Sequence, residues 1–240
     1  MRATPGSAPP RFPGYDVTDQ SHTWDEVTKG VVLGRLDPPA TMQFFSPEEV
    51  PTARALVNRL LAQDEEPRVP AVELIDAKLA ARQGDGYRHR DMPEDWEAWR
   101  RSVAGLDADG RRASGRPFWD LSRQEQKNGI EHVRGLDGDW YGMPSERVFP
   151  LWLRYACEAF YAHPWAWNEI GFGGPAYPRG YKNLGIGRRE PWEVAEAYEP
   201  DPIPWVERAE AARRRHEPEP TPPDDDQSST TGRSADDHRR

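Results

Sequence analysis

The chain has 240 residues, a net charge of -9 and a mean hydropathy of -0.93. Because such an acidic chain offers no large basic field to phosphates, we expect no nucleic-acid partner. The single cysteine, Cys157, excludes an internal disulfide bond and a metal site built from cysteines.

The two ends of the chain differ in composition from its middle. Residues 1–13 are small, polar and rich in proline, and no large apolar residue occurs from Glu217 to Arg240. Such segments bury too little apolar surface to fold. We therefore predict a disordered N-terminus over 1–13, a single helical domain over 14–206, and a charged, disordered tail over 207–240, with a charged helix at best over 207–215.

The middle of the chain predicts a mainly α fold, a compact bundle of about five helices. The first part of the domain, through Leu36, shows mixed apolar spacing and predicts an irregular or extended arm, with 31–33 as a short buried piece. Helix-start signals and apolar residues at helical spacing then recur five times. The predicted helices cover residues 46–63, 70–83, 93–106, 122–135 and 144–162, and a short helical turn is predicted over 191–195.

Two of these helices begin with a capping-box pattern, in which a serine precedes a glutamate by three positions: Ser46 with Glu49, and Ser122 with Glu125. The third predicted helix is expected to stop before the sequence Asp-Ala-Asp-Gly at 107–110, which is typical of a turn. Pro150 lies in the early turns of the fifth helix and predicts either a bend or a later start.

Residues 163–181, here called the aromatic segment, contain five aromatic residues, four glycines and three prolines. No helical or strand periodicity runs through them, so the sequence predicts a loop. Ordering such a segment is costly unless its rings pack on something. Its rings are therefore expected to pack either on the rest of this chain or on a partner.

The aromatic segment and the histidines of the chain allow several functional interpretations. Gly171, Gly173 and Ala176 fit a dinucleotide-binding pattern, but the preceding residues predict a helix where that pattern requires a strand. His163 is either a general base or, as we favour, a helix-end residue that hydrogen-bonds the loop. The other histidines weighed as metal ligands are scattered, so no metal site is expected; they are His22, His89 and His132.

A carbohydrate site is the remaining interpretation. Trp165 and Trp167 would be stacking platforms, and Asn168 and Glu169 would bind hydroxyl groups of a sugar or polyol. With His163, these residues would line the pocket of an enzyme that acts alone. A non-enzymatic alternative is a scaffold protein without a redox role, whose aromatic segment packs only on its own helices.

The run from Ala159 to Tyr181, together with the helix opening Phe44-Phe45-Ser46-Pro47-Glu48-Glu49, resembles the gluconate 2-dehydrogenase subunit 3 family. The similarity spans roughly residues 40–185. It implies a small subunit that binds no cofactor itself and assembles with a large FAD-dependent oxidoreductase of the glucose–methanol–choline type, and with a cytochrome subunit in some systems. The small subunit is expected to stabilise, mature or help export the large one. This chain has no Cys-x-x-Cys-His haem site, so it is not the electron carrier.

We accordingly expect a non-catalytic accessory subunit, without catalytic, cofactor-binding or metal-binding residues of its own. Its partner-binding residues are expected in the aromatic segment: His163, Trp165, Trp167, Asn168, Glu169, Phe172, Gly173, Gly174, Pro175, Tyr177, Arg179 and Tyr181.

The sequence also bears on location. No apolar run approaches the length of a bilayer, so no direct membrane insertion is expected. Members of the family often begin with a twin-arginine signal, and residues 1–13 show neither that pattern nor the apolar stretch of a secretory signal. We therefore expect a cytoplasmic protein or, alternatively, one that is exported together with a signal-bearing partner.

Overall fold

The computed structural model describes residues 12–39, 41–183 and 188–194. These residues are mainly helical, as predicted, with one two-stranded sheet. The predicted disorder of 1–11, the boundary at 206, the tail over 207–240 and the helix over 207–215 lie outside the described residues. Within the described ranges, none of the helices combines the length and apolar character that a membrane span needs.

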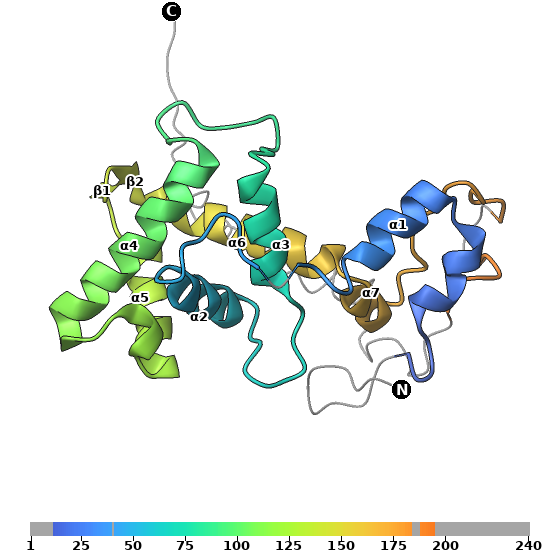
Figure 1. Cartoon of the computed structure of the whole chain (residues 1–240), viewed down its shortest axis with the longest axis horizontal. Helices are drawn as coiled ribbons and strands as arrows, with labels where there is room; N and C mark the ends of the chain where they lie inside the picture. The colour runs from blue at the N-terminus through green and yellow to red at the C-terminus, as the bar shows by residue number, and fades with distance from the viewer. Residues whose placement is uncertain (1–11, 40, 184–187, 195–240) are drawn as a thin grey trace, which may run out of the picture. The chain divides into compact units, whose positions relative to one another are not determined.

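Five α-helices form the main body (Figure 1). One of them, α6 (Ser145–Ala162), contacts each of the other four. Their inward faces share one hydrophobic core, whose largest fully buried side chains include Trp99, Trp152 and Tyr155. The five helices are α2 (Val50–Leu60), α3 (Ala71–Ala80), α4 (Asp95–Ser114), α5 (Arg123–Arg134) and α6 (Ser145–Ala162).

The two predicted capping boxes have different outcomes. Ser122 and Glu125 form both reciprocal bonds, and α5 begins directly after Ser122. At the other site only half of the box is present, because the Glu49 carboxylate accepts the Ser46 N–H at 2.8 Å while the Ser46 hydroxyl turns to Glu48. Residues 47–49 form a turn, so α2 begins at Val50 and later than predicted.

Helix α4 continues through residues 107–110, where the sequence predicted a turn, so that prediction is wrong. Distant partners hold its two aspartates in helical positions. Asp107 accepts hydrogen bonds from the Thr52 hydroxyl at 2.6 Å and the Phe118 N–H at 3.0 Å. Asp109 accepts one from the Trp140 indole at 2.9 Å. The helix ends instead at Gly115, which is left-handed.

A short hairpin leads into α6. Strands β1 (Asp139–Trp140) and β2 (Met143–Pro144) pair antiparallel around Tyr141 and Gly142. Both turn residues have positive φ, as a two-residue turn between right-twisted strands requires. Helix α6 then begins at Ser145 and continues through Pro150, so the later start is not found.

The N-terminal arm is helical, and the prediction of an irregular or extended arm is wrong. It contains a 3-10 helix, η1 (Val17–Thr23), and α1 (Glu26–Gly34). Asp25 explains the start of α1, since its carboxylate accepts the N–H groups of the second and third helical residues. Of the predicted buried piece over 31–33, Val32 is buried and Val31 is more than half exposed.

The aromatic segment begins with a helix, α7 (Pro164–Ile170), so the prediction of a loop throughout is wrong. Pro164 suits the first position of a helix because its ring fixes φ and a first-turn N–H needs no helical partner. Gly171 ends the helix in the left-handed region, with φ of 67°. Later in the chain, a single turn over 190–193 is found near the predicted helical turn.

Candidate functional site

His163 joins α6 to α7 and caps both helices. It is the C-cap residue of α6 and the N-cap residue of α7. Its Nδ1 accepts the Trp165 N–H at 3.1 Å. The prediction of a helix-end residue that hydrogen-bonds the following segment is confirmed. Burial lowers the pKa of His163 to about 4, with the charge of Arg35 adding to the effect. The ring is therefore neutral near pH 7, and its capping nitrogen is already occupied.

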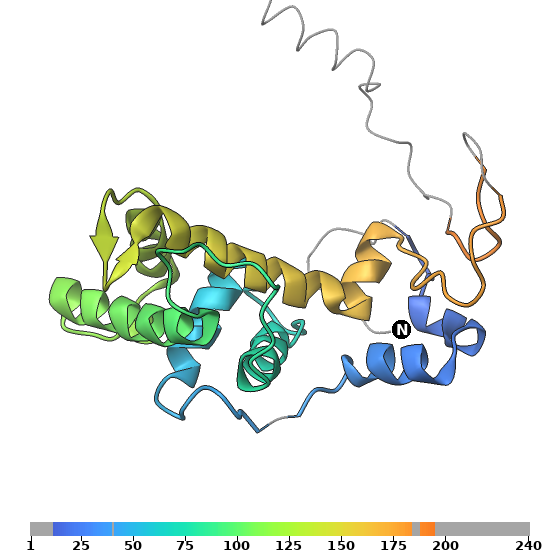
Figure 2. The same cartoon turned by 90° about the horizontal axis from the view of Figure 1, so that it is seen from above.

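The second half of α7 and the residues that follow it hold the N-terminal arm. The Asn168 side-chain carbonyl accepts the Val17 N–H at 2.8 Å. Arg179 donates to the Thr23 hydroxyl at 3.0 Å and to a carbonyl within its own loop. Trp167 completes a small apolar cluster with Val17, Trp24 and Val32. Figure 2 shows the arm lying beside the end of α7.

Glycines allow this close packing. At Gly174, where φ is 77°, an added Cβ would lie 2.8 Å from the Trp24 ring and 3.2 Å from Val17. At Gly173 it would lie 2.9 Å from the Trp192 ring. At both positions the backbone lies directly against an aromatic ring. Only glycine fits there, because any side chain would collide with the ring. A helix, α7, precedes these glycines, where a dinucleotide-binding loop requires a strand.

The twelve residues expected to bind a partner fall into three groups by exposure. His163, Trp167, Gly173 and Gly174 are buried within the chain. Phe172, Tyr177 and Tyr181 are 40%, 70% and 47% exposed. The others are half-buried: Trp165, Asn168, Glu169, Pro175 and Arg179. The segment thus has an inner face that fixes it and an outer face of rings.

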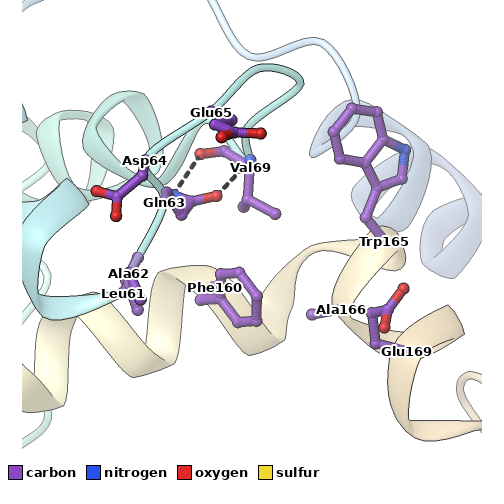
Figure 3. A pocket seen from close by; sticks show the side chains of 10 residues that line it. All are labelled: Leu61, Ala62, Gln63, Asp64, Glu65, Val69, Phe160, Trp165, Ala166 and Glu169. Carbon is purple, nitrogen blue, oxygen red and sulfur yellow. Dashed lines mark hydrogen bonds between the residues drawn. The ribbon is translucent and has the colours of Figure 1, made fainter. Parts of the chain in front are cut away.

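A cavity of about 280 Å³ opens beside α7 (Figure 3). Trp165, Ala166 and Glu169 line one side from α7, and Phe160 lines it from α6. The opposite wall is the connection between α2 and α3, through these residues: Leu61, Ala62, Gln63, Asp64, Glu65 and Val69. It is mostly walled by apolar groups, with carboxylates on both sides.

Sequence reasoning placed only Trp165 and Glu169 at this cavity and missed its other wall. Gln63 is buried, and its amide makes two bonds to Val69, accepting the backbone N–H at 2.7 Å and donating to the carbonyl at 3.2 Å (Figure 3). The sequence signal for this wall is Gln63 itself, a polar residue at the end of an apolar helical stripe. It was read only as the end of the helix, because its partner lies beyond the turn.

The residues proposed for an enzyme acting alone do not converge on one pocket. Trp165 and Glu169 line the cavity, whereas Trp167 packs on the N-terminal arm and Asn168 is engaged by Val17. Elsewhere in the described ranges, no group of three or more histidine, cysteine or acidic side chains is placed to hold a metal ion. Cys157 is a free, half-buried thiol on α6.

These features define a small helical protein with an aromatic segment fixed between its own N-terminal arm and a cavity. A model of the family described as gluconate 2-dehydrogenase subunit 3 matches residues 47–174, and the chain belongs to that family. The match runs from the turn before α2 to Gly174, so the arm lies outside it. No curated protein and no solved structure matches the chain.

Proposed function

We propose that this chain is a non-catalytic small subunit that assembles with and stabilises or matures an FAD-dependent dehydrogenase acting on sugars or alcohols. Membership of the gluconate 2-dehydrogenase subunit 3 family supports a place in a multisubunit complex. In the proposal, FAD belongs to a large subunit of the glucose–methanol–choline type, with or without a cytochrome subunit that accepts the electrons. The chain stays in the cytoplasm or is exported with a signal-bearing partner.

The observation that carries the proposal is the outer face of the aromatic segment. Phe172, Tyr177 and Tyr181 expose large parts of their rings, although Arg179, which lies between the two tyrosines, is held by bonds to Thr23 and Gly173. A fixed backbone lowers the entropy lost when such side chains are covered. Tyrosine and other aromatic residues are also enriched at protein interfaces. This face therefore suits contact with another protein.

Co-purification from the native host tests the proposal. The tagged full chain is expected to bring down a large protein with the visible absorbance of a flavin. A double variant, Tyr177→Ser with Tyr181→Ser, should lose that protein while its melting temperature stays near that of the wild type. Tyr87→Ser is the matched control, because Tyr87 is 63% exposed and lies outside the segment. Repeated recovery of the wild-type chain alone would contradict the proposal.

The stabilising role has a separate readout. The large subunit, produced with and without this chain, should differ in soluble yield and in bound flavin. Equal yield and equal flavin content in both cases would show that the chain neither stabilises nor matures the large subunit. That part of the proposal would then fail.

A further inference from the structure

The cavity beside α7 is small compared with most ligand-binding sites. Its volume of about 280 Å³ lies just under the range of roughly 300–1,000 Å³ that is typical of small-molecule sites. A site of this size suits a single long side chain. The question is which side chain its walls would bind.

Three carboxylates line the cavity, and none of its lining residues is a lysine, arginine or histidine. Asp64 pairs with Arg59 and Arg123, and Arg68 donates to its backbone carbonyl; these three arginines lie outside the lining. Glu65 and Glu169 form no ion pair with any residue in the described ranges. One of them lies on each side of the cavity, on the α2–α3 connection and on α7. Two carboxylates of the lining, those of Glu65 and Glu169, are therefore available to a cationic group.

The remaining walls contain two aromatic rings, those of Phe160 and Trp165, and both are half-buried. The negative face of an aromatic ring attracts a cation, most strongly for tryptophan. The connection that carries Glu65 is also held in shape, because the Gln63 amide bonds both backbone groups of Val69. Aromatic rings and carboxylates thus line the same cavity.

We propose that this cavity receives an arginine side chain of the partner protein. The inference rests on the proposed role as a subunit held by another protein. A guanidinium group is planar, so it can stack on Trp165 and Phe160 while its N–H groups donate to the carboxylates of Glu65 and Glu169. The pocket then acts as an anchor next to the exposed rings of the segment.

A probe that needs no partner tests the cavity directly. N-acetyl-arginine amide is titrated into the full chain, and the indole N–H signal of Trp165 is followed by NMR, assigned by its loss in Trp165→Phe. The uncharged isostere N-acetyl-citrulline amide is the matched probe. The arginine amide is expected to shift this signal and the citrulline amide is not. No shift with arginine, or equal shifts with both, would overturn the inference.

The carboxylates are tested by a double variant, Glu65→Gln with Glu169→Gln. It should bind the arginine amide, and any flavoprotein captured by the wild type, roughly ten-fold or more weakly. Asp137→Asn, which removes an exposed charge between α5 and β1, should bind both as the wild type does. If no flavoprotein is captured but the arginine amide binds, the proposed function fails and the cavity assignment stands. Unweakened binding by the double variant contradicts the assignment.

Discussion

The side-chain carbonyl of Asn168 accepts a hydrogen bond from the backbone N–H of Val17 at 2.8 Å, across 151 positions of sequence. Val17 is fully buried, and its N–H lies at the start of η1, where a helical N–H has no partner within the helix. The family-matched region therefore supplies a bond that the first helix of the arm cannot make for itself.

Gly174→Ala should destabilise the fold by roughly 2–3 kcal/mol. The new Cβ would lie 2.8 Å from the Trp24 ring, at a residue whose φ is 77°. The free energy of unfolding from urea denaturation gives the measurement. Gly180→Ala is the control, because φ there is 68° but nothing lies within 4 Å of the added Cβ. It should lose only about 1 kcal/mol from backbone strain, and equal losses at both sites would contradict the packing described.

His163 should make stability depend on pH. Its pKa is lowered to about 4 in the fold from an ordinary 6.5, so the unfolded chain takes up the proton first. Stability is complete above about pH 6.5 and falls as the pH falls toward about 4, by roughly 2–3 kcal/mol. Urea denaturation of the wild type and His163→Gln across this range measures it. The difference between the two should shrink on acidification, and a constant difference would contradict the prediction.

The two tryptophans of α7 should differ in their effect on stability. Trp167 is 6% exposed, and its indole donates to the Tyr161 carbonyl at 2.5 Å. Trp167→Ala is therefore expected to cost roughly 3–5 kcal/mol. Trp165 is half-buried at the cavity, so Trp165→Ala should cost less, about 1–2 kcal/mol. Melting curves of both variants give the order, and a greater loss for Trp165 would show that it is the core residue.

Asp76 should be among the most sensitive charged residues. It is buried, and its carboxylate accepts the N–H groups of Gln43, Phe44 and Phe45 at 2.6, 3.0 and 2.8 Å. Asp76→Ala leaves these three donors without a partner and should cost roughly 3–5 kcal/mol by chemical denaturation. Asp137→Ala, at an exposed carboxylate, should be neutral. Similar values for both would mean that water replaces the lost bonds.

Local signals predicted the helices that depend on local chemistry. The capping box at Ser122 and the apolar spacing of α3 and α6 gave the right elements, because their start signals lie within a few residues of the helix. Where the deciding contact is distant, the prediction was wrong. Asp107 is read as a turn residue until its bonds to Thr52 and the Phe118 N–H are known.

The candidate site was predicted only in part for the same reason. The density of rings and glycines identified the aromatic segment, but not which of its faces is buried. That depends on η1 and α1, which the apolar spacing of the arm did not indicate. The cavity wall at Gln63 likewise depends on a bond that closes after the chain has turned.

The contact between the N-terminal arm and the aromatic segment sets a practical limit on how the protein can be shortened. A fragment trimmed to the family-matched residues 47–174 would lose Val17, Trp24 and Arg179 together. It would expose Trp167 and the glycine backbone that these residues cover. The fragment would therefore have an apolar surface that is buried in the intact chain. Binding studies on such a fragment would report on that artificial surface, so experiments belong on the intact chain.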